Sequence, residues 1–347
     1  MQVEGQFDLA PEDHQERQLV AELPLDDRTW QIGAFIGPSG SGKSTLLRQL
    51  YGDPATLEWD PAASVLDAFP RQLTVQEVTG VLSSVGFSSP PAWLRPFHTL
   101  SNGEQFRVTV ARLLCSDAEP IVIDEFTSVV DRTVARIGAS AIASHVRRAA
   151  PGRQLVVASC HDDITDWLQP DWVYETGGGT FSWRSLHRRP RVRLEVYRSS
   201  AKAWRFFAHH HYLSDQVAPS AFCLVGCVEG KPAAFSAAVP QIGFVKMRRE
   251  SRVVVLPDFQ GVGIGNRLSE LHGALWRAVG VRFRAVASHP AVVAHRARSP
   301  LWLMDRAPSI KPPHAGRVLP GSSRRLTASF EYRGPATSLT EARALGL

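Results

Sequence analysis

The chain has 347 residues, of which 44% are hydrophobic and 21% are charged. This is an ordinary globular composition, and the length predicts two domains. No segment approaches the roughly 20 consecutive apolar residues of a membrane helix, and the first residues lack the basic and apolar regions of a signal peptide. The four cysteines lie in apolar, strand-like or helix-like contexts. We therefore expect a cytoplasmic protein with no membrane partner.

The net charge of +6 is divided unevenly along the chain. Residues 1–186 contain 14 Lys and Arg against 24 Asp and Glu, whereas residues 187–347 contain 25 against 9. Such an asymmetry favours a polyanionic partner, DNA or RNA, for the C-terminal half. A solubilising surface, or the phosphates of a coenzyme, would explain the same excess of positive charge.

A phosphate-binding loop follows the first apolar run. Residues 30–36 predict a short strand, the next residues match the full motif G-x-x-x-x-G-K-S, and residues 45–50 begin an amphipathic helix. In this arrangement backbone N–H groups and the helix N-terminus surround the phosphates of ATP. Lys43 would reach the β- and γ-phosphates, and Ser44 would bind Mg²⁺. The residues assigned to the nucleotide are Gly37, Ser39, Gly40, Gly42, Lys43, Ser44 and Thr45.

Acidic residues end a second apolar strand, residues 121–123. Asp124 would position the metal, directly or through water, and Glu125 would polarise the attacking water, because phosphoryl transfer depends on positioning and charge stabilisation. A third apolar run, residues 155–159, leads to His161, which can donate a hydrogen bond to the γ-phosphate.

These motifs resemble those of the ATP-binding cassette ATPases over residues 1–187. The resemblance implies that Ser101-Asn102-Gly103 is the family's signature motif, that Asp131 is its D-loop aspartate and that His161 is its switch histidine. It also implies a head-to-tail dimer, in which Ser101 and Gly103 of one subunit complete the ATP site of the other. We therefore expect an ATP-dependent homodimer.

The chain departs from the family pattern at three places. Asn102 replaces a glycine of the signature, and residues 64–70 contain no glutamine where the family's Q-loop is expected. The segment between the phosphate loop and the signature is also short. Transporter cassettes use this segment to couple to membrane partners, so a transport role is disfavoured.

The first domain ends in a predicted hairpin. Gly177-Gly178-Gly179 and residues 180–186 form this hairpin, and residues 188–192 form a basic, proline-containing linker. This linker needs no function, although a basic arm can touch a phosphate backbone. Residues 193–347 then form a second domain with a C-terminal extension.

A second glycine loop lies in this C-terminal domain. Residues 201–211 predict a helix, and residues 221–228, 233–239 and 252–256 predict strands. The last strand leads to Gln260-Gly261-Val262-Gly263-Ile264-Gly265, and a helix continues through residue 279. Glycines at such a strand-to-helix turn let backbone N–H groups approach a pyrophosphate, and the helix dipole assists.

This stretch resembles the acyl-CoA-binding motif of the GNAT superfamily of N-acetyltransferases, over residues 193–310. The resemblance implies an α/β chain in which the cassette domain is followed by an α+β domain with a mixed, largely antiparallel sheet. It also implies an acyl-CoA such as acetyl-CoA as the ligand. A dinucleotide-binding fold fits less well, because antiparallel-looking strands precede the loop. The residues assigned to the acyl donor are Gln260, Gly261, Gly263 and Gly265.

Acyl transfer needs one group that removes the proton of the nucleophile and another that protonates the leaving thiolate. The candidates are the polar cluster His209-His210-His211-Tyr212 with Asp215, and Ser288-His289 at the end of the predicted strand 282–287. Adjacent histidines on a helix point in different directions, so the run of three disfavours a metal site.

The segments around Tyr212, Ser288 and residues 298–302 together resemble the Mom-type branch of phage and prophage DNA-modification acyltransferases. The leading interpretation is therefore an ATP-hydrolysing cassette that controls an acyltransferase acting on nucleic-acid bases. One alternative is an ATP-regulated small-molecule or protein N-acetyltransferase. Another is a nucleic-acid-bound ATPase whose acyltransferase-like domain is only a binding module.

Overall fold

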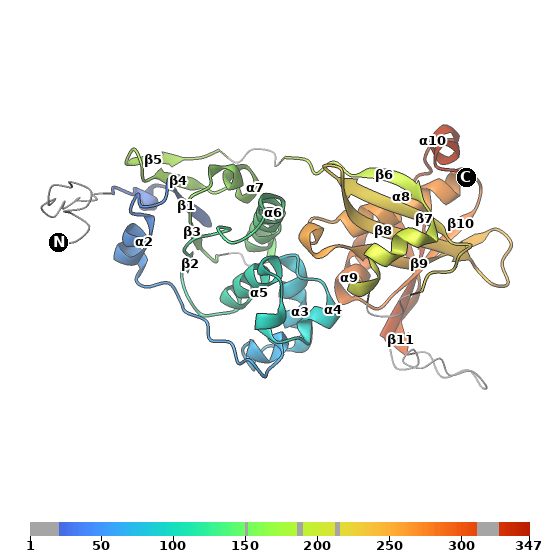
Figure 1. Ribbon diagram of the computed structural model, residues 1–347, viewed down its shortest axis with the longest axis horizontal. Helices are drawn as coiled ribbons and strands as arrows, with labels where there is room; N and C mark the ends of the chain where they lie inside the picture. The colour runs from blue at the N-terminus through green and yellow to red at the C-terminus, as the bar shows by residue number, and fades with distance from the viewer. Residues whose placement is uncertain (1–20, 150–151, 186–189, 212–215, 311–325) are drawn as a thin grey trace, which may run out of the picture.

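Two separate sheets organise the chain in the computed structural model, which describes residues 21–149, 152–185, 190–211, 216–310 and 326–347. The sheet of the N-terminal domain and that of the C-terminal domain lie side by side along the longest axis of the molecule (Figure 1). No helix among the described residues is both long enough and apolar enough to cross a membrane.

The N-terminal sheet has five strands in the order β2-β3-β1-β4-β5. All pairs are parallel except the last, which is antiparallel. Every residue of the central strand is buried, so helices must cover both faces of this sheet. The strands are β1 (Ile32–Ile36), β2 (Ile121–Ile123), β3 (Leu155–Ser159), β4 (Trp172–Glu175) and β5 (Thr180–Trp183).

Helices cover the two faces of this sheet differently. Helix α2 (Lys43–Tyr51) packs through Leu46 and Leu47 against one face. The other face is covered by α5 (Asn102–Leu114) and α6 (Arg132–Ala149). The remaining elements are η1 (Leu25–Asp27), η2 (Val65–Ala68), α3 (Val75–Ser84), α4 (Pro90–Trp93), η3 (Phe97–Thr99), η4 (Asp162–Ile164) and α7 (Thr165–Leu168).

The C-terminal sheet has seven strands in the order β11-β12-β10-β9-β8-β7-β6. Its pairs are antiparallel except β9 with β10, which is parallel, so the expected mixed and largely antiparallel sheet is confirmed. The strands are β6 (Glu195–Ser199), β7 (Phe222–Val228), β8 (Lys231–Pro240), β9 (Met247–Val255), β10 (Arg282–Ala287), β11 (Trp302–Ile310) and β12 (Leu326–Tyr332).

The parallel pair separates along its length. Strands β9 and β10 are in register only from Met247 to Arg249 on one side and from Arg282 to Arg284 on the other. Beyond these residues β9 continues to Val255 while pairing with β8 alone. The diverging edges leave space for a ligand within the sheet.

Helix α8 (Ile264–Ala278) covers one face of this sheet, and α10 (Leu339–Ala344) packs beside it. The opposite face is covered by the segment that was expected to be helical over residues 201–211, and it forms the 3₁₀ helices η5 (Ala201–Phe206) and η6 (Ala208–His210). Trp204 and Phe207 are both buried against this face.

Two further elements complete the C-terminal domain. These are η7 (Pro257–Phe259), which joins β9 to the glycine loop, and α9 (Pro290–Arg298), which follows β10. Ile137 of α6, in the N-terminal domain, is 2% exposed and belongs to the hydrophobic cluster of the C-terminal domain. The two domains therefore share part of one apolar core.

A glycine in β1 gives a direct test of the N-terminal core. A Cβ atom on Gly33 would lie 2.0 Å from the ring of Trp172, which is fully buried. We expect Gly33→Ala to lower the free energy of unfolding by about 1–3 kcal/mol, because the buried ring must move. Urea denaturation of the purified protein measures this change.

The matched control is Gly80→Ala in the exposed part of α3, where no atom lies within 4 Å of the added Cβ. There the substitution should stabilise the protein by about 0.5–1 kcal/mol, because alanine restricts the unfolded chain. Equal stabilities of the two variants would contradict the packing of Trp172 on β1.

Candidate functional sites

The phosphate loop continues directly from β1 into α2. Gly40 and Gly42 have positive φ angles of 77° and 93°, and Gly42 immediately precedes the helix. The Nζ atom of Lys43 donates to the carbonyls of Gly37 at 2.8 Å and Pro38 at 2.7 Å. The ammonium group is therefore held across the loop. The other predicted residues, Ser39, Ser44 and Thr45, lie in this loop and in the first turn of α2.

The order of the strands brings the remaining ATP residues to the same edge. Strand β3 lies between β1 and β2, and all three are parallel. His161 follows β3, and Asp124 and Glu125 follow β2. Because parallel strands end at one edge, these side chains lie on the side of the sheet where the phosphate loop begins. Glu125 is exposed and has a φ of 49°, a conformation that is sparsely populated by residues other than glycine.

The predicted signature lies at the start of α5. The side chain of Ser101 caps this helix by accepting the backbone N–H of Glu104, and the Glu104 carboxylate accepts the backbone N–H of Ser101 at 3.0 Å. Ser101 and Asn102 are exposed, and α5 packs on the face of the sheet opposite to α2. Asp131 accepts the backbone N–H of Thr133 at 2.9 Å, and this bond lowers the pKa of Asp131.

A pocket of about 380 Å³ opens where β9 and β10 diverge. Its walls are residues 250–255 of β9, residues 286–289 at the end of β10, and the glycine loop. Gly263 has a φ of 83° and immediately precedes α8, and a Cβ atom there would meet nothing within 4 Å. The start of α8 therefore offers its backbone N–H groups to a ligand in this pocket.

Comparison with known proteins assigns the N-terminal domain. No family model matches the chain. The cytochrome c biogenesis ATP-binding export protein CcmA of Rhodospirillum rubrum is 34% identical over 163 residues, which cover 38% of this chain and 68% of that protein. This chain belongs to the ATP-binding cassette ATPases. Residues 21–185 as described are hereafter called the cassette.

Two further proteins are similar to this chain at lower sequence identity. The hemin import ATP-binding protein HmuV of Thermobifida fusca is 29% identical over 186 residues, and the chain spans 64% of that protein's length. A solved structure of an IAA acetyltransferase from Bacillus cereus aligns with a TM-score of 0.32 and 10% identity, covering 40% of this chain and 99% of the other.

The cassette contributes to the wall of the pocket in the C-terminal domain. Ser83, Ser88 and Pro90 line the pocket together with the glycine loop. The side chain of Gln260 is held between the domains, because Oε1 accepts the Ser88 backbone N–H at 2.8 Å and Nε2 donates to the Val255 carbonyl at 2.9 Å. Of the four residues assigned to the acyl donor, Gln260 thus uses its side chain for the domain contact.

His289 also joins the two domains. Its Nε2 atom lies 3.2 Å from the Ser88 carbonyl, and its ring lies 5.6 Å from that of Trp93. Burial lowers the pKa of His289, so the imidazole is neutral at pH 7. His289 and its neighbour Ser288 both line the pocket.

Some of the other predicted catalytic residues line this pocket, and others lie outside the described residues. His210 and His211 line the same pocket as Ser288, and burial lowers the pKa of His210. Tyr212 and Asp215 lie outside the described residues. Within the described part of the chain, no group of three or more His, Cys, Asp or Glu side chains is arranged to hold a metal ion.

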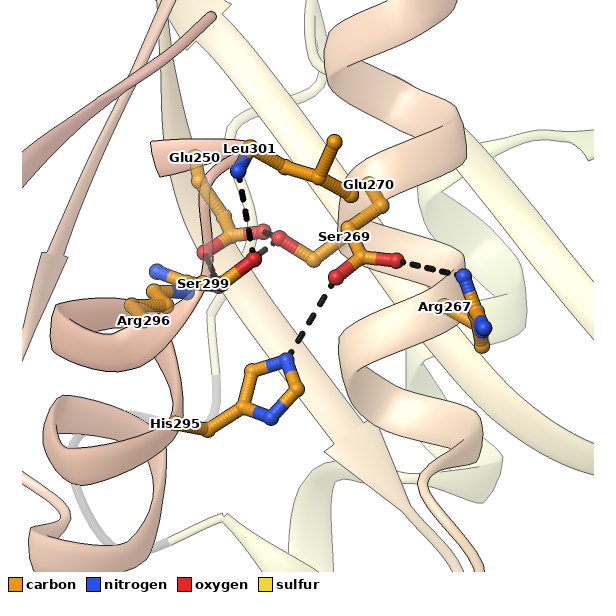
Figure 2. Close-up of polar contacts among 8 residues, drawn as sticks. All are labelled: Glu250, Arg267, Ser269, Glu270, His295, Arg296, Ser299 and Leu301. Atoms are coloured by element: carbon orange, nitrogen blue, oxygen red, sulfur yellow. Dashed lines mark hydrogen bonds and ion pairs between the residues drawn. The ribbon is translucent and has the colours of Figure 1, made fainter. Parts of the chain in front are cut away.

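The structure contains a buried network of polar and charged side chains beside the pocket that the sequence did not predict (Figure 2). Ser269 of α8 donates to Glu250 of β9 at 2.5 Å, and Arg296 of α9 donates to Glu250 at 2.8 Å and to Ser269 at 2.7 Å. The side chains of Glu250 and Arg296 are 7% and 3% exposed, and both residues line the pocket. The expected strand began at residue 252, which left Glu250 outside it.

A second carboxylate supports this network. Glu270 of α8 pairs with Arg267 at 3.2 Å and contacts His295 of α9 at 3.4 Å (Figure 2). The guanidinium of Arg296 also lies 4.4 Å from the centre of the Trp302 ring. Because removing one partner would leave a buried charge unpaired, these contacts hold α8 and α9 in one arrangement around the pocket.

Proposed function

We propose that this chain is an ATP-hydrolysing cassette ATPase that controls a fused acyl-CoA-dependent acyltransferase, and that the acyl acceptor is a nucleic-acid base. The observation that carries the acyltransferase assignment is the pocket between β9 and β10, into which the glycine loop opens at the start of α8. The cassette assignment is supported by its family and by its phosphate loop.

Hydrolysis is assigned to side chains at the edge of the N-terminal sheet. The Ser44 hydroxyl and the Asp124 carboxylate are hard oxygen donors that suit Mg²⁺, and the bound ion neutralises charge on the β- and γ-phosphates. Glu125 orients and polarises the attacking water, and His161 donates to the γ-phosphate. The partner subunit in an ATP-dependent homodimer is expected to be contacted by Ser101, Gly103 and Asp131.

The acyl donor is assigned to the start of α8. Its pyrophosphate would accept the backbone N–H groups of residues 261–265, where the dipole of the 15-residue helix favours negative charge. The thioester arm would then lie along the unpaired edge of β9. In the reaction the acceptor nitrogen attacks the thioester carbonyl and gives up a proton, the C–S bond breaks, and the leaving thiolate takes up a proton. Ser288 and His289 line the pocket and are assigned to these two proton transfers.

A nucleic-acid acceptor is supported by charge and by an exposed hairpin. The turn between β8 and β9 exposes Ile242 to 92% and Val245 to 95%, and Lys246 and Arg248 follow it. Apolar side chains flanked by cations are typical of surfaces that contact bases and phosphates together. Such a surface on the same domain as the acyl-transfer pocket supports a nucleic-acid base as the acceptor, and the proposed reaction is DNA modification.

Substitutions in the cassette test the ATP assignments. We expect Glu125→Gln to retain ATP and to lower steady-state hydrolysis about 10²-fold or more, because water is no longer polarised. The trapped ATP should then hold a dimer, which sedimentation velocity detects. Lys43→Ala should lose both ATP binding and dimerisation. Unchanged hydrolysis by Glu125→Gln would remove Glu125 from this role.

Substitutions at the two ends of α8 test the acyl donor. Gly263→Glu places a negative charge at the pyrophosphate position, and we expect at least a tenfold loss of acetyl-CoA affinity in calorimetry on the full chain. Gly280→Glu is the matched control, because Gly280 has a similar φ of 73° and open space but lies beyond the C-terminal end of the helix. Equal affinities of both variants and the wild type would refute this site.

Salt dependence tests the acceptor. We expect the full chain to bind a labelled DNA or RNA oligonucleotide with an affinity that falls steeply with salt, about one power of concentration for each phosphate contact. Ile242→Ala should weaken binding with little change in this slope, whereas Arg248→Ala should reduce the slope. Acetyl-CoA binding without any affinity for nucleic acid would favour a small-molecule or protein N-acetyltransferase.

A further inference from the structure

A buried arginine connects the cassette to the glycine loop. Arg107 of α5 is 1% exposed, and its NH1 atom donates to the carbonyls of Gly86, at 3.1 Å, and Pro257. Its NH2 atom donates to the carbonyl of Asp258 at 3.1 Å. Burial lowers the pKa of Arg107 to about 10, which leaves the guanidinium charged at neutral pH. One planar group therefore binds backbone from both domains.

The same helix reaches η7 at a second point. Helix α5 begins directly after Ser101, and a Cβ atom on Gly103 would lie 3.9 Å from the Asp258 carboxylate. The signature motif and Arg107 thus lie on one rigid element, and both lie beside Pro257–Phe259.

Close contacts with the cassette hold the residues that join η7 to the pocket. Gln260 follows η7 at once and is bonded to Ser88 of the cassette. A Cβ atom on Gly261 would lie 2.7 Å from the Gly86 Cα atom and 2.8 Å from the Ala141 Cβ atom. Close-packed contacts do not stretch, so the glycine loop is held against α6 and against Gly86, whose carbonyl accepts a hydrogen bond from Arg107 of α5.

We infer that the acyl-donor pocket is a composite of both domains, and that Arg107 makes its affinity for acyl-CoA depend on the ATP state of the cassette. The identity of this ligand rests on the function proposed above. In the proposed homodimer, nucleotide held by the partner subunit closes on the signature at the start of α5, and Arg107 passes this constraint to the glycine loop, so ATP and the acyl donor bind with positive cooperativity. By linkage, the acyl donor strengthens ATP binding by the same factor.

The experiment compares ATP-bound and ATP-free protein in the Glu125→Gln background, which keeps ATP intact. Hydrogen exchange of residues 257–265 should slow when ATP is added, and the acetyl-CoA dissociation constant measured by calorimetry should fall about fivefold or more. The exchange readout needs no acyl-CoA, so it tests the coupling separately from the identity of the ligand.

Arg107→Lys keeps the positive charge but loses the two guanidinium nitrogens that donate to carbonyls of both domains. Arg107→Met removes the charge and these donors together. Each should lose the ATP response of the loop and of acetyl-CoA affinity while still binding ATP. The matched control is Arg136→Ala, because the Arg136–Glu229 pair also joins the domains, at 3.3 Å, but Arg136 binds the 59% exposed Glu229 between β7 and β8 instead of backbone next to the glycine loop. Arg136→Ala should retain both responses.

The possible outcomes separate the coupling between the domains from the identity of the ligand. A loop whose exchange ignores ATP, or an Arg107→Lys protein that responds as fully as the control, overturns the coupling. If ATP slows exchange only when Arg107 is present but no variant binds acetyl-CoA, the coupling stands and the proposed donor is wrong.

Discussion

The arrangement of the molecule depends on burying one charged side chain between its domains. Removing a guanidinium from water costs several kcal/mol unless its donors are satisfied. The two terminal nitrogens of Arg107 donate to the carbonyls of Gly86, Pro257 and Asp258, whereas its buried Nε atom has no partner among the described residues. Separating those backbone atoms would therefore leave further buried donors unpaired. These hydrogen bonds thereby specify where the glycine loop lies relative to the cassette. An apolar contact such as that of Ile137 buries surface area but does not fix an orientation between the domains.

The two candidate sites share one local arrangement. In each, a loop that follows a strand ends in a glycine with positive φ, and a helix begins at once: Gly42 precedes α2 and Gly263 precedes α8. The difference lies in the neighbouring strands. The loop after β1 is flanked by parallel strands that carry acids and a histidine, which suits phosphoryl transfer. The loop before α8 lies beside diverging strands, which leave an open backbone edge for an extended ligand.

Short motifs in the sequence predicted the structural features that are encoded by consecutive residues. The strand–loop–helix segment at Lys43, the acids after β2, and the glycines before α8 were all found, because backbone geometry at a turn demands particular residues in a particular order. Sequence pattern placed α8 and the helical segment at residues 201–210, although it did not distinguish an α-helix from the two 3₁₀ helices that form there.

The sequence by itself therefore determined the two glycine loops and the family of the cassette, because each is encoded within a few neighbouring residues. Only the tertiary structure decided what surrounds them. It revealed the pairing of Glu250 with Arg296, and it showed that Gly261 packs against Gly86. It also showed the role of Arg107, whose partners in the C-terminal domain, Pro257 and Asp258, lie 150 and 151 positions away. Contacts at that separation leave no periodic signal, since they arise only when two independently patterned domains bury a common surface.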